Sequence, residues 1–346
     1  MKSPLVLLLA ASLALSGCGQ SSTSTTSSTS APAAAPSSAP APTAAQKLTI
    51  GLLPKSKGNA YFVSCAEGAQ KAADQLGDTL IFDGPTQTDP GKQNEIVENW
   101  INSGVDVIAV AAENKDGLST ALRKAQAKGI KVISFDADVL PDARTFFVNQ
   151  ATPQGIGYAL MDEAARLTGN TGEFAIITAS LTAANQNEWK KYIDEDLAKN
   201  YPNMTLVDFR PCDDDKAKAQ AEATTLMSAH PNLKLIMAIC TPGVPGAAEA
   251  VKQAGKTGSV KVIGLGLPNE NKQYVHDGVT DSVILWNTKD LGYLTIEAAD
   301  ALAKGTLKPG DKSFSVGNTT YQIDGDNILL GKPFIFNKDN IDQFNF

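Results

Sequence analysis

From residue 47 onward, the chain alternates between short, continuous apolar runs and longer segments whose apolar residues recur every three or four positions. The first pattern is typical of buried strands and the second of amphipathic helices. In the first half of the chain we expect strands at 47–53, 79–82, 105–112, 130–135 and 145–148. Helices are expected between them, at 59–77 and around residues 96–101 and 118–125.

A second series with the same alternation follows. We expect its strands at 173–178, 205–209, 233–239, 260–265 and 282–286, and its helices at 155–167, 186–201, 217–230, 244–254 and 273–276. Continuous apolar strands separated by amphipathic helices indicate parallel sheets covered on both faces. Two series of similar length therefore predict an α/β fold with two doubly wound, parallel-sheet lobes.

The last part of the chain breaks the alternation. An amphipathic helix at 291–303 is followed by a strand-rich tail, which we interpret as chain returning across the junction to complete both sheets. This predicts an N-terminal lobe of residues 47–149 plus about 288–330, and a C-terminal lobe of residues 150–287 plus about 331–346. Ligands of open parallel sheets bind beyond the carboxyl ends of the strands, so we expect the site in the cleft between the lobes.

The first 17 residues have the pattern of an export signal rather than of folded protein. Lys2 supplies a positive charge, and a short apolar run from Leu5 to Leu15 precedes Ser16-Gly17-Cys18. A run of this length does not span a bilayer permanently. Small residues before a cysteine resemble a bacterial lipobox, which implies that Cys18 is acylated and becomes the mature N-terminus. The alternative is an ordinary secretory signal with an incidental cysteine.

Residues 18–46 consist almost wholly of Ser, Thr, Ala, Pro and Gln, and residues 19–46 contain no charged or aromatic side chain. Such a segment has too little apolar surface to fold, so we interpret it as a lipidated, disordered tether. No later segment is long and apolar enough to cross a membrane, which leaves the lipid as the only expected anchor. The net charge of −7 argues against nucleic acid as a partner, because phosphate binding needs a basic surface.

Polar and aromatic side chains gather where the expected strands end. They are Lys55, Tyr61 and Phe62 after the first strand, Asp136 and Asp138 after the fourth, Asn149 at the fifth, and Asn185, Gln186, Trp189, Thr241, Trp286 and Asn287 in the second half. Hydroxyl groups both donate and accept, so carboxylates and amides hold them in a fixed orientation, while aromatic rings cover the apolar faces of a sugar. The set predicts a site for a small polyhydroxylated ligand.

Each of these assignments has a plainer alternative. Asp136 could cap a turn, and Asp138 fits better in a turn or behind the ligand-contacting residues. Lys55 could be a solvated loop charge, and Asn185 with Gln186 could simply start a helix. Of the two neighbouring aromatic residues after the first strand, we expect one to face the ligand and the other the core.

Catalysis has weak support in the sequence. The chain has two histidines, His230 and His276, and no GxSxG, HExxH or P-loop motif. A lipid-anchored sugar-modifying enzyme therefore lacks a recognisable nucleophile and base, and we expect no catalytic residue, cofactor or metal. The run from Asp213 to Asp215 could attract a cation but is more typical of a solvated helix start. Cys65, Cys212 and Cys240 lack metal-binding spacing, and their odd number leaves their pairing open.

Several segments together resemble the sugar-binding type I periplasmic binding proteins, in the branch of rhamnose-binding and autoinducer-2-binding receptors. The matching segments are 53–55, 83–86, 148–153, 186–189, 285–286 and 336–342. The resemblance implies two Rossmann-like domains, joined by three hinge strands, that close over a ligand and deliver it to an ABC importer. It also implies an extracytoplasmic, monomeric protein whose partners are a sugar-like ligand and permease subunits.

The resemblance also implies individual ligand contacts. A lysine and an aspartate of the autoinducer receptors fall on Lys55 and Asp136, and contacts through small residues fall near Ile239 and Thr241. An aspartate–glutamine pair falls on Asn185-Gln186, and a further aspartate falls on Asn287, so two carboxylates are replaced by amides. Because an amide can donate and a carboxylate only accepts, we favour a deoxyhexose such as rhamnose, with autoinducer-2 as the alternative. The sequence does not separate uptake from a sensory role.

Overall fold

The computed structural model describes residues 47–346. The predicted signal peptide at 1–17, the lipidation site Cys18 and the tether at 18–46 lie outside the described residues. Within residues 47–346, no helix is long and apolar enough to cross a membrane.

The first part of the chain builds what we call the N-lobe, the part of the molecule packed on an eight-stranded sheet. Its early elements are β1 (Thr49–Leu53), α1 (Ala60–Leu76), β2 (Thr79–Phe82), α2 (Pro90–Ser103), β3 (Val107–Val110), α3 (Lys115–Ala127), β4 (Lys131–Phe135) and β5 (Phe146–Asn149). Its late elements are α9 (Thr288–Lys304), β11 (Ser313–Val316), β12 (Thr319–Asp324) and β13 (Asn327–Leu329). The strand order is β11-β12-β13-β5-β4-β3-β1-β2, parallel from β13 to β2 and antiparallel at β11 and β12.

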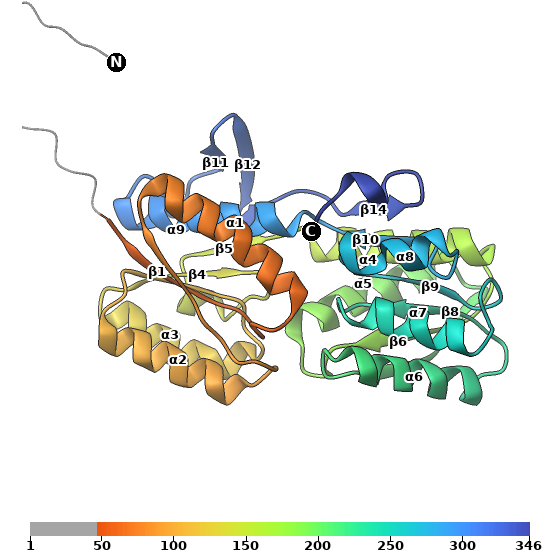
Figure 1. Cartoon of the computed structure of the whole chain (residues 1–346). Coiled ribbons are helices and arrows are strands. Elements are labelled where there is room, and N and C mark those ends of the chain that lie inside the picture. Colours follow the sequence, from red (N-terminus) through yellow and green to blue (C-terminus); the bar gives the residue numbers. More distant parts are fainter. Residues whose placement is uncertain (1–46) are drawn as a thin grey trace, which may run out of the picture. The chain divides into compact units, whose positions relative to one another are not determined.

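The N-lobe sheet is covered on both faces, with α1 and α9 on one side and α2 and α3 on the other (Figure 1). Helices α1 and α9 approach closely because glycines stand at their contact. A Cβ atom on Gly68 would lie 1.8 Å from the Lys289 carbonyl oxygen, and one on Gly292 would lie 1.8 Å from that of Cys65. On the opposite face Trp100 is buried against Gly51, which agrees with its expected place in the core.

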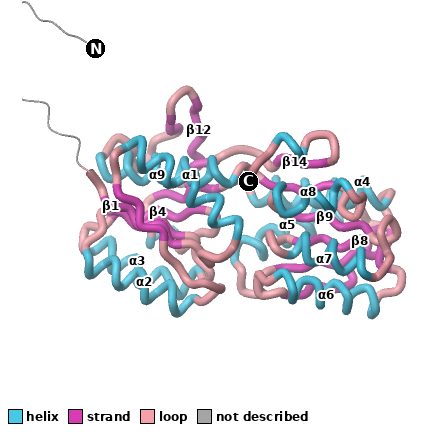
Figure 2. Tube along the Cα trace, in the orientation of Figure 1, coloured by secondary structure: helices cyan, strands magenta, loops and turns pink. Residues whose placement is uncertain are grey.

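The middle of the chain builds the C-lobe, which we define by its own sheet. Its elements are α4 (Pro153–Thr168), β6 (Gly172–Thr178), α5 (Ala184–Asn200), β7 (Met204–Pro211), α6 (Lys216–Ala229), β8 (Leu233–Ala238), α7 (Gly243–Gln253), β9 (Lys261–Gly264), α8 (Pro268–His276), β10 (Ser282–Leu285) and β14 (Phe334–Asn337). Strands β7-β6-β8-β9 are parallel. Two isolated bridges join β9 to the segment of β10, and β10 pairs antiparallel with β14. The two sheets are separate, each flanked by helices (Figure 2).

The chain passes between the two sheets three times, from β5 to α4, from β10 to α9 and from β13 to β14. The predicted fold class of two doubly wound α/β lobes is therefore confirmed. The residue bounds given to each lobe stay a prediction, because residues 47–346 form one compact unit.

Candidate ligand-binding site

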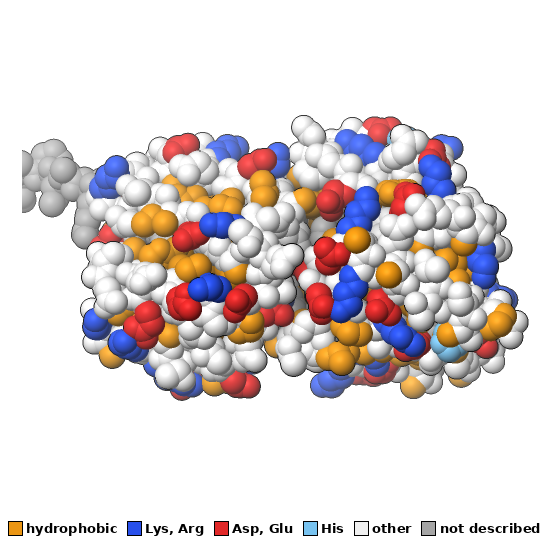
Figure 3. Space-filling view, turned by 60° about the horizontal axis from the view of Figure 1, so that its bottom comes forward, with side chains coloured by type: hydrophobic (Ala, Val, Ile, Leu, Met, Phe, Trp, Pro, Cys, Tyr) orange, Lys and Arg blue, Asp and Glu red, His pale blue; other side chains and the backbone are white. Residues whose placement is uncertain are grey.

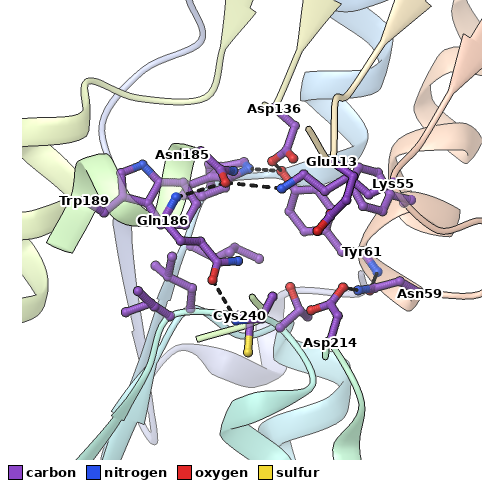
Figure 4. A pocket seen from close by; sticks show the side chains of 17 residues that line it. Lys55, Asn59, Tyr61, Glu113, Asp136, Asn185, Gln186, Trp189, Asp214 and Cys240 are labelled. Carbon is purple, nitrogen blue, oxygen red and sulfur yellow. Dashed lines mark hydrogen bonds between the residues drawn. The ribbon is translucent and has the colours of Figure 1, made fainter. Parts of the chain in front are cut away.

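A small cavity lies where the carboxyl ends of strands from both lobes meet. The lining residues are Lys55, Asn59, Tyr61, Phe62, Glu113, Asp136, Ala179, Asn185, Gln186, Trp189, Asp214, Ile239, Cys240, Thr241, Leu265, Leu285 and Trp286. Their labelled side chains surround one open centre in Figure 4. Charged side chains of both signs lie along the two sides of the furrow between the lobes (Figure 3).

Asp136 follows β4 in a left-handed backbone conformation, with φ at 59°. Asp and Asn are the non-glycine residues that adopt this region most readily. The turn directs the buried carboxylate into the cavity, where Oδ1 accepts a hydrogen bond of 2.8 Å from the Tyr61 hydroxyl. The Trp286 indole N–H in turn donates to the Tyr61 oxygen at 2.8 Å. Three segments distant in sequence are thus joined through one hydroxyl group.

The cavity carries more acidic than basic groups. Burial raises the pKa of the Asp136 carboxyl, and Lys55 opposes this shift by its positive charge. Burial likewise raises the pKa of Glu113 and of Asp214, and Lys55 again acts in the opposite direction in both cases. Lys55 is the one cation among the lining residues. Three carboxyl groups that share one ammonium group favour a ligand that offers many hydrogen-bond donors.

The C-lobe contributes amides from the start of α5. The Gln186 side-chain oxygen accepts from the Thr178 hydroxyl and, at 2.8 Å, from the Ala179 amide. Its nitrogen therefore remains as the donor toward the cavity. The neighbouring Asn185 oxygen accepts from Lys55 Nζ at 3.2 Å, which is a direct hydrogen bond between the lobes.

Asp214 makes a further direct link between the lobes. Its Oδ2 accepts a hydrogen bond of 2.6 Å from the Asn59 side-chain amide at the start of α1. Together with the Lys55–Asn185 and Trp286–Tyr61 bonds, it holds the cleft in a closed arrangement around the cavity.

Apolar side chains complete the wall supplied by the C-lobe. Ile239, Leu265 and Leu285 come from the ends of β8, β9 and β10, and all three are buried. Trp189 packs edge-on against Trp286, with ring centroids 6.2 Å apart. The cavity therefore has aliphatic and aromatic surface beside its carboxylates and amides.

Ten of the residues proposed from sequence line this cavity: Lys55, Tyr61, Phe62, Asp136, Asn185, Gln186, Trp189, Ile239, Thr241 and Trp286. Tyr61 and Phe62 both lie in the lining, where one of them was expected to face the core. Whether these residues contact a ligand stays a prediction.

Three proposed residues lie elsewhere. Asp138 forms an ion pair of 2.8 Å with the buried Arg144. Asp138 and Asn149 both line a second, neighbouring pocket. Asn287 caps α9, because its side-chain oxygen accepts from the amides of Lys289 and Asp290 at 3.0 and 3.3 Å.

Three cavity residues were not expected as site residues from the sequence: Asn59, Glu113 and Asp214. Glu113 directly follows the apolar run expected as a strand at 105–112, a position that could have indicated it. The helix start expected at residues 213–215 is present, with Asp215 as the N-cap of α6. Asp214, however, has φ at 55° and lines the cavity, so it is not simply a solvated charge.

Residues 50–307 match the family described as periplasmic binding protein domain. This chain is a periplasmic binding protein. An ABC-transporter solute-binding protein from Clostridium phytofermentas, solved with bound L-rhamnose, is 32% identical to it. That alignment covers 87% of this chain and 98% of the other, with a TM-score of 0.83. The resemblance inferred from the sequence is confirmed.

Two further relatives bind other ligands. LsrB from Clostridium saccharobutylicum, in complex with AI-2, is 26% identical over 86% of this chain and 100% of its own, with a TM-score of 0.81. The D-ribose/D-allose-binding protein of Pseudomonas aeruginosa is 29% identical over 67% of this chain and 75% of its own length. The periplasmic binding protein described here thus groups with sugar-binding components of ABC transporters and not with enzymes.

Proposed function

We propose that this protein is the lipid-anchored substrate-binding protein of an ABC importer and that it captures a monosaccharide, preferably a rhamnose-like deoxyhexose. The observation that carries the proposal is the composition of the cavity. Carboxylates and amides suited to hydroxyl groups lie in the same small space as three aliphatic side chains. A deoxyhexose has both features, since it presents several ring hydroxyls and one methyl group.

In this proposal the polar lining residues hold the hydroxyls. Asp136, Glu113 and Asp214 accept hydrogen bonds, while Lys55 and the Gln186 nitrogen donate them. A hydrogen bond to a charged group contributes about 1.5–3 kcal/mol and a neutral one about 1 kcal/mol. Three or four such bonds support micromolar binding, about −8 kcal/mol.

The aliphatic side chains give the site its preference. Ile239, Leu265 and Leu285 form a surface on which a methyl group packs without loss, whereas a hydroxyl placed there has no partner. Burying an unpaired hydroxyl costs about 1–3 kcal/mol. Trp189 and Trp286 supply flat surface for the face of the sugar ring.

Closure follows from the connections between the lobes. Three chain crossings form a hinge, and the ligand adds hydrogen bonds between the same walls that Lys55–Asn185 and Asn59–Asp214 already join. The closed form then docks on permease subunits as a monomer at the extracytoplasmic face of the membrane. Acylated Cys18 tethers the folded body there.

The alternative ligand is autoinducer-2, taken up or sensed. Lys55, Asp136 and Gln186 all line the cavity and match the residues that the autoinducer-receptor resemblance implies. Asn185, which lines the cavity, stands where that resemblance implies a carboxylate, which favours the deoxyhexose.

The test compares ligands that differ by one group. Titration calorimetry with L-rhamnose and with L-mannose, which adds only the 6-hydroxyl, should give Kd values at least about 5-fold apart in favour of L-rhamnose. Autoinducer-2 and D-ribose are titrated in parallel. Saturable binding of autoinducer-2 with no response to L-rhamnose would replace the deoxyhexose by the alternative, and no response to any of the four would refute the sugar site.

The anchor is tested separately. The full chain should partition into the detergent phase of a cell-envelope extract, and a Cys18→Ser variant should move to the aqueous phase. Equal partition of the two proteins would exclude lipidation at this residue.

A further inference from the structure

Two cysteines meet beneath the ligand cavity. Cys212 follows β7 and Cys240 follows β8, on either side of the end of β6, which is the strand between them in the sheet. The Cys212 amide donates to the Thr178 carbonyl oxygen at 2.8 Å, which fixes the end of β7 against β6. The two sulfur atoms are 3.4 Å apart.

Both thiols are buried, but they differ in their access to the cavity. Cys212 is fully enclosed, whereas Cys240 is 3% exposed and belongs to the cavity lining. Cys65, the other cysteine of the described residues, lies on α1 in the N-lobe and is also buried. It therefore serves as a matched control for a buried thiol in the same protein.

The two sulfur atoms lie close together beneath the start of α7. A disulfide has an S–S distance of about 2.05 Å, so bond formation requires an approach of about 1.3 Å. The start of α7 packs directly on this pair. A Cβ atom at Gly243 would lie 2.8 Å from Cys240 Sγ, so the absence of a side chain there makes room for the sulfur.

We propose that Cys212 and Cys240 form a disulfide when the protein reaches the extracytoplasmic space, and that this bond fixes the floor of the ligand cavity. The oxidant is a disulfide of a thiol oxidoreductase or of a small molecule. One cysteine thiolate attacks that disulfide and releases one thiol. The second cysteine thiolate then attacks the mixed disulfide and releases the other thiol. The two protons and two electrons given up by the cysteine thiols end on the oxidant, which becomes two thiols.

The timing of the reaction follows from the environment of the thiols. The hydrogen bond to Cys212, and then burial, raise the pKa of the Cys240 thiol well above its ordinary value. Since the thiolate is the reactive form, the packed pair reacts slowly. The disulfide therefore forms as the lobe folds, before the sulfur atoms are enclosed.

The bond acts on two loops that line the cavity. Asp214 lies two residues after Cys212, and Thr241 directly follows Cys240. Asp213 and Asp214 both have positive φ, a backbone conformation that aspartate adopts only locally. A covalent link between the loops restricts the unfolded chain and holds Asp214 beside Asn59.

The thiol state can be read residue by residue. The full chain, recovered from the envelope of a bacterium that exports it, is denatured and alkylated before reduction and is then digested with trypsin. Mass spectrometry should find peptide 200–216 linked to peptide 235–252, while peptide 58–71, which carries Cys65, is alkylated. Reduction of the native protein should lower the Tm by several degrees.

Two variants provide the controls. Cys65→Ala should retain the linked peptides, and Cys212→Ala should return peptide 235–252 alkylated and unlinked. Recovery of both peptides fully alkylated from the exported wild-type protein would overturn the proposal, as would a link from either of them to Cys65. The readout needs no ligand, so this failure would leave the proposed sugar site untouched.

Discussion

Replacement of Asp136 by asparagine separates the charge of the site from its shape. Asparagine adopts the left-handed conformation that φ of 59° requires, whereas alanine there costs about 1–2 kcal/mol of strain. The amide oxygen also keeps the hydrogen bond from Tyr61. The exchange therefore removes one negative charge and leaves the backbone in place.

The size of the effect follows from the contacts of the carboxylate. Oδ1 is engaged by Tyr61, so Oδ2 remains for one ligand hydroxyl. A charged acceptor bond of about 1.5–3 kcal/mol becomes a neutral one of about 1 kcal/mol, a loss of about 0.5–2 kcal/mol. The Kd for L-rhamnose, measured by titration calorimetry, should rise about 2- to 30-fold.

Asp136→Asn should weaken ligand binding but should not lower the stability of the ligand-free fold. Burial raises the pKa of Asp136 above its unfolded value, so the folded protein binds this proton more tightly than the unfolded chain. The ionised group therefore destabilises the ligand-free fold at neutral pH, and this penalty disappears on acidification below the unfolded pKa. Urea unfolding at pH 7 should show Asp136→Asn to be as stable as the wild type or more stable.

Asp138→Asn is the matched control two residues away. It weakens the ion pair with the buried Arg144 and should lower stability by about 1–3 kcal/mol while leaving the Kd unchanged. An Asp136→Asn protein with wild-type affinity, or one that loses both stability and affinity, would refute the assignment of Asp136 as a ligand contact.

Three further predictions concern other parts of the molecule. Burial raises the pKa values of the three cavity carboxyls above their ordinary values of 3.8 and 4.5. Acidification should therefore protonate these carboxyls, and weaken L-rhamnose binding, at a pH above those values. Calorimetry at pH 7.5, 6 and 5 would contradict this if the Kd stayed constant. Asp214→Asn should raise the ligand dissociation rate about 2- to 30-fold in stopped-flow measurements, because a charged interlobe bond to Asn59 becomes neutral, and an unchanged rate would argue against this link as a closure contact. Gly68→Ala should lower the free energy of unfolding by about 1–3 kcal/mol, because the added Cβ forces α1 away from α9. Gly331 has open space around it, so Gly331→Ala should have little effect in the same thermal unfolding assay. Equal effects would show that the helix contact adjusts freely.

Local sequence patterns were sufficient to predict the fold class, because the residues within and beside each helix or strand indicate its type. Buried strands of four to eight residues and capped amphipathic helices are encoded over short stretches, as in α1, which begins after Asn59 and ends at Gly77. Asp136 could be proposed because it directly follows such a strand. The same rule would also have indicated Glu113.

Two residues show where local reasoning stops. A run of three aspartates looks solvated, and only the left-handed backbone at Asp213 and Asp214 turns the second carboxylate inward. Asn287 matched a ligand position by resemblance, yet its oxygen is occupied by the first turn of α9. Both outcomes depend on backbone geometry that composition and spacing do not encode.

The order of strands in the N-lobe sheet has a consequence for biosynthesis. Strand β13, at residues 327–329, pairs with β5, which the ribosome completes almost 180 residues earlier. Helix α9, which covers one face of that sheet, is likewise made after most of the C-lobe. Strand β14 of the C-lobe is made later still, so neither lobe completes its pairing early, and the N-lobe edge at β5 stays unpaired until nearly the whole polypeptide has emerged. A chain with this order completes its sheets only when synthesis is nearly finished, which suits a member of an extracytoplasmic family.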